Sequence, residues 1–309
     1  MKSKIAYYMR QIEKLENGEY VAPITCEIDP SNRCMLDCSF CMYSDTNKRS
    51  NENLDFGLYC SAVSQLSSME CRSITFTGGG EPLMNLRFNA MAEFAKGMGF
   101  QLGLITNGIL SHNIESPEYF KFIRISINAG NRSDYKKITG KDLFHKVLDN
   151  VQRLIERGAF VGLSYVVCPD NVKGVKNASA LARELGVKYI QFKPAWINGA
   201  PFNDYEVEGE GVIDTRRYVA KDYMPCLIAH LIGIIGADAR MYFCCQYRGD
   251  KRFDLGSIKD STIRDLWAKR LNITPDIESC PQCRYMNYAR AYEELRIEHS
   301  IFSDHKDFL

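Results

Sequence analysis

Residues 32–43 read NRCMLDCSFCMY and follow a β-rich run at 23–29. They carry Cys34, Cys38 and Cys41 in the spacing C-x3-C-x2-C. Three thiolates on one short loop can ligate three irons of a [4Fe-4S] cluster and leave the fourth iron open to an external ligand. On spacing alone, a partial zinc site or three unrelated cysteines are the alternatives. The segment therefore predicts a metal-binding loop just after the first strand.

Short β-rich runs alternate with helical segments around this loop. Helix-period segments such as 144–157 separate the runs, and Gly, Pro or Asn lies near each run. This alternation is typical of an α/β fold with parallel strands. Six βα units predict a partial (β/α)6 barrel, in which functional loops lie at the C-terminal ends of the strands. The predicted strands span 23–29, 72–77, 100–106, 122–128, 160–167 and 187–192.

The pattern changes after Pro194. Residues 200–211 are polar and contain glycine, and few clear βα repeats follow them. We therefore expect a first part at 1–20 formed by an amphipathic helix, the barrel at 21–200, and a small C-terminal domain with a tail at 201–309.

Charge and hydropathy exclude several classes of protein. The 309 residues carry 39 Lys and Arg against 38 Asp and Glu, so the net charge of +1 gives no basic field for direct nucleic-acid binding. The longest apolar run, at 226–237, is far shorter than the roughly 20 residues that a membrane span needs. The N-terminus lacks the apolar core of a signal peptide. We expect a cytoplasmic protein that does not enter a membrane, and the sequence says nothing about its oligomeric state.

A second motif ends the second predicted strand. Residues 77–82 read TGGGEP, where the glycines let the backbone approach a ligand and the carboxylate can accept from an ammonium group. With the cysteine loop, this motif resembles the radical S-adenosylmethionine (SAM) superfamily, in which C-x3-C-x-aromatic-C binds the reducing cluster and G-G-E-P contacts the amino group of SAM. The resemblance implies that Cys34, Cys38 and Cys41 hold a [4Fe-4S] cluster and that Phe40, Gly79, Gly80, Glu81 and Pro82 belong to the cofactor site.

The resemblance extends along the later strands. ITNG at 105–108 and RISIN at 124–128 lie where superfamily members contact the ribose of SAM. Asn128 stands where many relatives have Asp, and turn chemistry is the alternative for Ser126 and Asn128. Lys193 could meet the SAM carboxylate or the substrate, or it could be a solvated rim residue. The cofactor residues predicted in this way are Thr106, Asn107, Ser126, Asn128, Ser164 and Lys193.

The resemblance also implies an activity. In this superfamily one electron cleaves SAM to a 5′-deoxyadenosyl radical, which abstracts a hydrogen from the substrate. The cofactors supply this chemistry, so the protein must hold the reactive carbon against a substrate C–H bond and exclude water. The protein partner implied is an external one-electron donor such as flavodoxin or ferredoxin.

A second set of cysteines lies in the C-terminal part. Twelve cysteines are many for a reducing compartment, where clustered thiols more often hold metal than form disulfides. Four thiolates can close a second [4Fe-4S] cluster with no open iron. A structural zinc site is the alternative, although such sites usually have two close pairs and this set has one. The set comprises Cys226, Cys244 or Cys245, Cys280 and Cys283.

The segments around these cysteines resemble the SPASM and shortened twitch auxiliary-cluster extensions of the superfamily. They are GADARMYFCC at 236–245, and LGSI and IRDLW within 255–267. The chain looks like the shorter type, with one auxiliary [4Fe-4S] cluster in a small C-terminal iron–sulfur domain. The order and spacing are most similar to those of aminocyclitol dehydrogenases in this superfamily, which favours Cys244 over Cys245 as the ligand.

A closed cluster cannot bind SAM, so we expect it to accept an electron. A substrate radical that becomes a carbonyl must lose a proton and an electron, and a nearby oxidised cluster is a suitable acceptor. This favours a radical SAM oxidoreductase of the dehydrogenase type. The alternatives are an epimerase, with Cys168 or Cys245 as the hydrogen donor, or another redox-neutral radical enzyme. Packing in the core is the other interpretation of Cys168.

The predicted substrate class depends on which substrate-recognition segments the sequence contains. About twenty residues precede the first strand, too few for a peptide-recognition domain, so we prefer a small hydroxylated or amino-bearing molecule of the sugar, aminocyclitol or nucleotide type over a peptide. Trp196 could stack on a ring of it. Outside the enzymes, a cysteine-rich metal-binding module is the alternative, but such a module needs no open iron site. Position alone nominates Tyr165, Lys193 and Asp204 as the catalytic base, and that role stays open.

Overall fold

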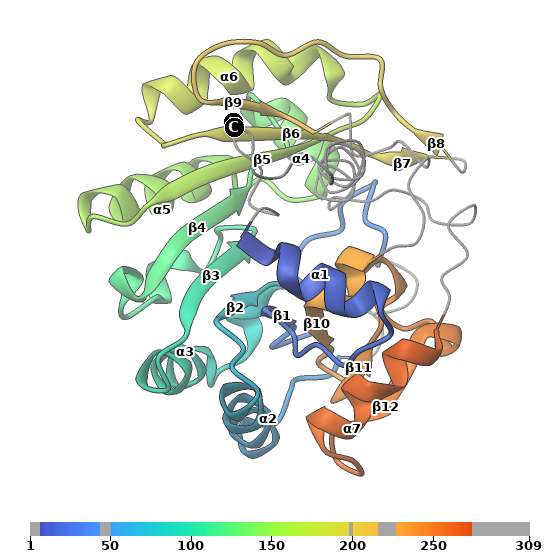
Figure 1. Cartoon of the computed structure of the whole chain (residues 1–309). Coiled ribbons are helices and arrows are strands. Elements are labelled where there is room, and N and C mark those ends of the chain that lie inside the picture. Colours follow the sequence, from blue (N-terminus) through green and yellow to red (C-terminus); the bar gives the residue numbers. More distant parts are fainter. Residues whose placement is uncertain (1–6, 44–50, 198–199, 216–226, 274–309) are drawn as a thin grey trace, which may run out of the picture.

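A computed structural model describes residues 7–43, 51–197, 200–215 and 227–273 of the chain. In these residues ten strands form one curved sheet (Figure 1), in the order β12-β11-β10-β1-β2-β3-β4-β5-β6-β9. Strands β1 to β6 pair successively in parallel, which confirms the predicted α/β fold and its six strands. Their bounds are β1 Thr25–Ile28, β2 Ser73–Phe76, β3 Gln101–Thr106, β4 Phe120–Ser126, β5 Val161–Val167 and β6 Ile190–Pro194.

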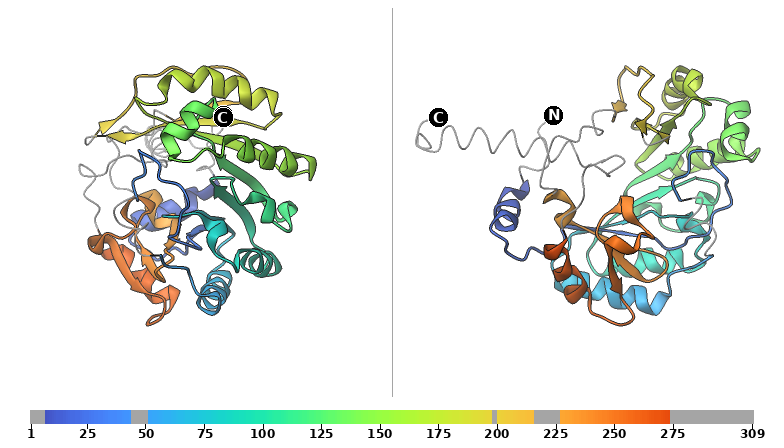
Figure 2. Two further views of the ribbon diagram at one scale, coloured as in Figure 1. Left: turned by 180° about the vertical axis from the view of Figure 1, so that it is seen from behind. Right: turned by 90° about the vertical axis from the view of Figure 1, so that its right-hand side faces the viewer.

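Helices cover the outer face of this sheet, as the views in Figure 2 show. In α5, Phe144, Val147, Val151 and Leu154 are buried at helical spacing, which confirms the segment predicted at 144–157. Asp55 caps α2 by accepting a hydrogen bond from the backbone N–H of Leu58 at 2.9 Å. The helices are α2 Phe56–Ser68, α3 Phe88–Gly97, α4 Arg132–Thr139, α5 Phe144–Glu156 and α6 Val175–Glu184.

The connection from β3 to β4 differs from the regular βα pattern. It contains two 3-10 turns, Ser111–Asn113 and Pro117–Tyr119, and no α-helix. Gly108 in the left-handed region, at φ 81°, and the proline at the start of the second turn interrupt helical geometry here.

Strands beyond residue 200 extend the same sheet on both sides. β9 (Val212–Asp214) pairs in parallel with β6, and β10 (Ile232–Ile235) pairs in parallel with β1. β11 (Arg240–Tyr242) and β12 (Asp254–Ser257) add antiparallel strands beyond β10. The apolar run noted in the sequence thus contains a fully buried strand. The division of the chain near 200 stays a prediction.

The remaining elements pack against this frame. α1 (Met9–Glu16) lies within the helix predicted near the N-terminus and buries Ile12 and Leu15. α7 (Ile263–Ala268) lies beside α2, where Gln65 Oε1 accepts from the backbone N–H of Ile263 at 2.8 Å. β7 (Trp196–Ile197) and β8 (Ala200–Pro201) form a two-stranded ribbon. In the described residues, none of the helices has the length and apolarity needed to span a membrane.

The two faces of β1 show how the fold positions polar groups. Cys26 and Ile28 join the main core, where Cys71 also lies, so Cys26 and Cys71 are packing groups. Glu27 alternates with them and forms an ion pair with Arg248. The strand therefore buries apolar side chains on one face and carries charge on the other.

Candidate functional site

The cysteine loop is held by backbone hydrogen bonds. The N–H groups of Asp37 and Ser39 donate to the carbonyls of Thr139 and Ile138, both at 3.1 Å. The N–H of Cys41 donates to the carbonyl of Cys38 at 3.0 Å. The end of α4 thus braces the centre of the loop. All three cysteines, Cys34, Cys38 and Cys41, are partly exposed.

The donor set of this loop fits an iron–sulfur cluster. Three partly exposed thiols follow β1 at the carboxyl edge of the parallel strands. Among the residues that the structure describes, no three Cys, His, Asp or Glu side chains gather as a single metal ion requires. A four-iron cluster binds its thiolates at separate irons, so its ligands stand farther apart than those of one ion. This loop would hold such a cluster with three ligands.

Gly80 lets the TGGGEP turn contact the cysteine loop. A Cβ atom there would lie 2.4 Å from the carbonyl oxygen of Arg33 and 2.5 Å from that of Asn32. The N–H of Glu81 donates to the Arg33 carbonyl at 2.7 Å. Only glycine allows this approach, because any side chain would displace backbone. The two motifs recognised in the sequence are therefore in direct backbone contact.

The Glu81 carboxylate is buried and bonded within the protein. Its Oε1 accepts from the Thr106 hydroxyl at 2.5 Å, and its Oε2 accepts from the backbone N–H of Asn107 at 2.7 Å. Burial raises the pKa of Glu81 to about 7, although these hydrogen bonds act in the opposite direction. Thr106 and Asn107, both predicted at the cofactor site, thus tie the end of β3 to the TGGGEP turn. The Asn107 side-chain amide also donates to Met35 Sδ at 3.1 Å.

We expect Thr106→Val to lower the free energy of unfolding by roughly 1–3 kcal/mol, because a buried carboxylate oxygen loses a donor. Urea denaturation under anaerobic conditions measures this. Thr25→Val is the matched control, since the partly buried Thr25 hydroxyl bonds only neutral groups: it donates to the Ser73 carbonyl at 3.3 Å and accepts from the Ser73 hydroxyl at 2.9 Å. An equal loss in both variants would contradict a special role for the Thr106 hydroxyl.

The predicted residues at the ends of β4 and β5 also bond one another. Asn128 is in the left-handed region at φ 53°, and its Oδ1 accepts from the backbone N–H of Val166 at 2.9 Å. The hydroxyls of Ser126 and Ser164 lie 3.4 Å apart. Asn171, which sequence reasoning missed, donates to the carbonyls of Asn128 and Val166 at 3.0 and 2.8 Å. Asn128 thus joins the ends of β4 and β5 through its Oδ1, and its role at the cofactor stays a prediction.

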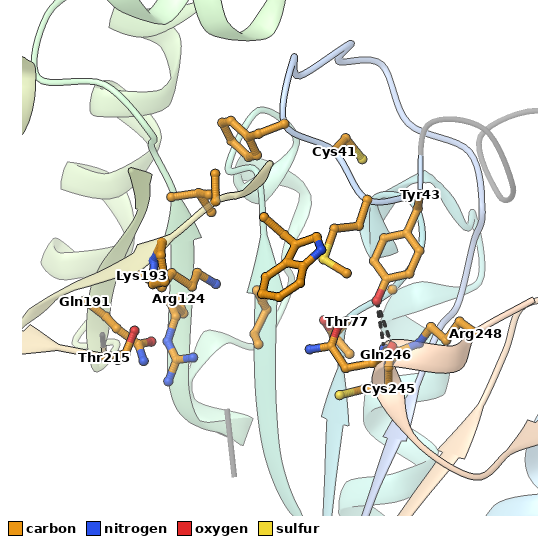
Figure 3. A pocket seen from close by; sticks show the side chains of 18 residues that line it. Cys41, Tyr43, Thr77, Arg124, Gln191, Lys193, Thr215, Cys245, Gln246 and Arg248 are labelled. Carbon is orange, nitrogen blue, oxygen red and sulfur yellow. Dashed lines mark hydrogen bonds between the residues drawn. The ribbon is translucent and has the colours of Figure 1, made fainter. Parts of the chain in front are cut away.

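A cavity of about 280 Å³ lies at the mouth of the barrel (Figure 3). The cysteine loop contributes Phe40 and Cys41 to its lining, and the end of β2 contributes Thr77 and Gly78. Lys193 from β6 and Trp196 line it as well. Its other lining residues are Met42, Tyr43, Ile105, Arg124, Val166, Gln191, Pro194, Ala195, Thr215, Cys245, Gln246 and Arg248.

A buried ion triad beside this cavity escaped sequence reasoning. Arg248 pairs with Glu27 Oε2 through Nη2 at 2.8 Å and with Asp29 Oδ2 through Nε at 2.7 Å. Burial raises the pKa of Asp29 to about 6, although the guanidinium acts to lower it. Two acidic residues at alternate positions of an apolar strand were the available signal. The triad joins β1 to the segment that carries Cys244 and Cys245.

The cysteine loop reaches the same segment. The Tyr43 hydroxyl donates to the Cys245 carbonyl at 2.9 Å, and Arg248 Nη1 donates to that carbonyl at 2.9 Å. Cys245 lines the cavity, whereas Cys244 packs between two small apolar clusters. Cys226, Cys280 and Cys283 lie outside the described residues.

Other nominated residues lie away from the cavity lining. Cys168 is buried with Ile138 and Ala195, and burial raises the pKa of its thiol, so the structure places it in a packing role. The buried Tyr165 hydroxyl donates to the Asn171 carbonyl at 2.6 Å, and Asp204 is exposed. Of the three residues nominated as a base, Lys193 alone is part of the lining.

The model of one protein family matches residues 28–182, which are 155 of the 309 residues, and that family is the radical SAM superfamily. The chain belongs to the radical SAM superfamily. It is therefore an enzyme whose cofactors are SAM and a [4Fe-4S] cluster, as the two motifs predict. The match begins at Ile28, the last residue of β1, and contains the cysteine loop, the TGGGEP turn and strands β2 to β5.

Individual proteins resemble the chain over part of its length. The uncharacterised protein MJ0804 of Methanocaldococcus jannaschii is 33% identical over 132 residues, which are 40% of this chain and 41% of that protein. A probable GTP 3′,8-cyclase of Saccharolobus islandicus is 25% identical over 185 residues, 56% of this chain and 58% of that one. The chain thus spans about half the length of these relatives.

The fold is also similar to that of a solved structure. Streptococcus suis SuiB, bound to precursor peptide SuiA, superposes with a TM-score of 0.64 at 11% identity, over 84% of this chain and 68% of that chain. At this identity the likeness concerns the fold alone. It agrees with the mostly parallel sheet described above.

Proposed function

We propose that this chain is a radical SAM oxidoreductase of the dehydrogenase type, which oxidises a small hydroxylated or amino-bearing substrate. SAM cleavage supplies a 5′-deoxyadenosyl radical for hydrogen abstraction, and oxidation then requires an electron acceptor near the substrate. The observation that carries the proposal is the lining of one cavity by Cys41 and by Cys245. The first is a predicted ligand of the SAM cluster, and the second adjoins the predicted auxiliary ligand Cys244.

The auxiliary [4Fe-4S] cluster is the acceptor in this proposal. We assign its ligands as Cys226, Cys244, Cys280 and Cys283, in a C-terminal domain at 201–309. Three of them lie outside the described residues, so the assignment rests on their order and spacing, which are similar to those of aminocyclitol dehydrogenases. The hydrogen bond from Tyr43 to the Cys245 carbonyl supports it, because it links the two cysteine segments directly.

The iron content of two neighbouring variants tests this proposal. We expect wild-type protein reconstituted under anaerobic conditions to hold about eight irons and Cys244→Ala to hold about four, because one four-iron cluster loses a ligand. Cys245→Ala is the matched control and should keep about eight. If Cys245→Ala held about four irons and Cys244→Ala about eight, Cys245 would be the auxiliary ligand in place of Cys244. Zinc in place of the second four irons would contradict the electron-acceptor role.

An epimerase is the second candidate, favoured by the position of Cys245. Its side chain lines the cavity from the side opposite Lys193 (Figure 3), where a thiol can return a hydrogen atom to a substrate radical. Both cysteines are packed in buried clusters, but Cys168 does not line the cavity and is less suited to that role. Solvent deuterium at a substrate carbon, lost in Cys245→Ala, would indicate epimerisation. Loss of two hydrogens from the substrate in both proteins would indicate oxidation.

We prefer a sugar, aminocyclitol or nucleotide substrate over a peptide. The volume of the cavity, about 280 Å³, suits a small molecule, and SAM must share this region. One relative is named for a reaction of GTP, which supports the nucleotide class. The electron donor in this proposal is a flavodoxin or ferredoxin, and the cytoplasm is the compartment that would keep the thiols reduced.

A further inference from the structure

We infer that Arg124, on the barrel face of β4, binds an anionic group of the substrate, either a phosphate or a carboxylate. The inference rests on the proposed function in one respect, namely that a small molecule occupies the cavity together with SAM. It adds the charge of that molecule and the residue that recognises it.

The barrel interior is shaped to hold the Arg124 side chain. The guanidinium carbon lies 5.3 Å from the centre of the Phe122 ring and 5.6 Å from that of the Tyr189 ring. Arg124 Nε donates to the Tyr189 hydroxyl at 3.0 Å. Two aromatic neighbours and one hydrogen bond thus fix the orientation of the guanidinium group.

Glycines in the neighbouring strands make room for both rings. A Cβ atom on Gly103 of β3 would lie 2.4 Å from the Phe122 ring. A Cβ atom on Gly162 of β5, the register partner of Arg124, would lie inside van der Waals contact with the Tyr189 ring, at 2.2 Å. Both strands therefore have glycine, which has no side chain, at the positions where the aromatic rings beside Arg124 need the space. This arrangement of glycines and aromatic rings indicates that Arg124 is oriented for a role other than packing.

The charge of Arg124 is not neutralised by the residues that the structure describes. In that part of the chain, no carboxylate lies within 4.0 Å of its guanidinium nitrogens, and Nε makes the one hydrogen bond that we find from the group. Arg248, which lines the same cavity, differs because it pairs with two buried carboxylates. A partly buried guanidinium with available N–H donors is suited to an anionic ligand.

The composition of the cavity lining also favours an anionic ligand. It contains Arg124, Lys193 and Arg248 and, among the described residues, no Asp or Glu. The charge of Arg248 is offset by the triad, whereas Arg124 lies on the β4 side of the cavity. Low dielectric around such cations strengthens their attraction for an anion.

Arg124 begins the RISIN segment at 124–128, yet it lies apart from the TGGGEP turn, the motif that would hold the amino group of SAM. In Figure 3, Arg124 lies with Gln191, Lys193 and Thr215 on one side of the cavity, and Thr77, Cys245 and Arg248 lie on the other. The TGGGEP turn begins at Thr77, so the amino group of SAM belongs to that second side. An anion at Arg124 would therefore anchor the second ligand of the cavity. The planar fork of the guanidinium suits two oxygens of a phosphate or a carboxylate.

Anion titration of the reconstituted protein tests this inference, with inorganic phosphate and malonate as probes at constant ionic strength. Trp196 lines the cavity, so its fluorescence reports occupancy, and Trp196→Phe should lose the signal. We expect Arg124→Gln to weaken binding of at least one probe by about tenfold or more. Arg132→Gln is the matched control and should bind within about twofold of wild type, because Arg132 is exposed on α4 and pairs with Asp142.

Arg124→Lys keeps a charge but loses the fork, and it serves as the second variant if Arg124→Gln unfolds. We expect its affinity for the bound probe to fall by about threefold or more. A response to phosphate alone, or to malonate alone, would identify which anion the substrate carries. Equal binding by wild type and both Arg124 variants would overturn the inference.

The dissociation constant of SAM provides the decisive comparison. If Arg124→Gln weakened SAM binding by the same factor as probe binding, Arg124 would serve the carboxylate of SAM and the inference would be wrong. A change below about twofold for SAM supports the substrate anchor. The anion titration does not depend on an auxiliary cluster. The iron content of Cys244→Ala therefore tests the proposed oxidation independently of the titration.

Discussion

Replacing Cys34, Cys38 and Cys41 together by alanine is expected to lower the iron content from about eight to about four atoms per chain and to abolish SAM cleavage. The three thiols are carried by one loop, and the loop is braced by α4 and by the TGGGEP turn without the help of the thiols themselves. The variant should therefore fold and lose one cluster. Iron and sulfide analysis with EPR, followed by an assay for 5′-deoxyadenosine, measures both effects.

Cys60→Ala is the matched control for this variant. Cys60 is a partly exposed cysteine on α2, packed against the core, and we expect its replacement to leave the iron content and SAM cleavage unchanged. If the triple variant kept all its iron, the loop would not be a cluster site. A fall from about four irons to none, with zinc in the remaining thiolate site, would keep the SAM cluster but exclude the proposed electron acceptor.

The sequence predicted the elements whose signal is local. Alternating β-rich and helix-period segments placed all six strands from β1 to β6 and the helix α5, because the period and the length of each segment can be read within the segment itself. The cysteine and TGGGEP motifs were found because their spacing is fixed by the backbone turn that carries them. Gly80 shows the reason, since a Cβ atom would collide with the loop.

The sequence could not predict contacts between distant segments. β10 joins β1 in parallel although about 200 residues separate them, and nothing in either strand specifies its neighbour. The cavity residues Arg124 and Arg248 were missed for the same reason, because an arginine in a strand or a turn shows no signal until its partners are known. Asn128, whose role at the cofactor stays a prediction, also bonds the backbone of Val166, a contact that only the register of β4 and β5 determines.

The ion triad also joins distant segments of the chain. Among the variants proposed, we expect Arg248→Met to lose the most stability. The Arg248, Glu27 and Asp29 side chains are 4%, 7% and 1% exposed, so removal of the cation takes the compensating positive charge away from two buried carboxylates. Breaking a buried ion pair in this way costs about 3–5 kcal/mol. Anaerobic urea denaturation at several pH values measures the loss.

The pH dependence distinguishes this mechanism from a packing defect. The pKa of Asp29 is about 6 in the folded protein, above its ordinary value of 3.8, so the folded state binds the proton more tightly and Asp29 lowers stability as the pH rises between these values. Without the guanidinium, which acts to lower this pKa, the pKa rises further. We therefore expect the deficit of Arg248→Met to be larger at pH 8 than at pH 6.

A neutral version of the triad completes the test. In Glu27→Gln/Asp29→Asn/Arg248→Met no charge is left without a partner, so most of the lost stability should return, and the difference between pH 6 and pH 8 should shrink. If the triple variant were as unstable as Arg248→Met, or if the deficit were equal at both pH values, Arg248 would act through its size and its bond to the Cys245 carbonyl. The Cys245 carbonyl also accepts from Tyr43 on the cysteine loop. The iron content of Glu27→Gln/Asp29→Asn/Arg248→Met then shows whether the charge of Arg248 is needed to hold the two cysteine segments together.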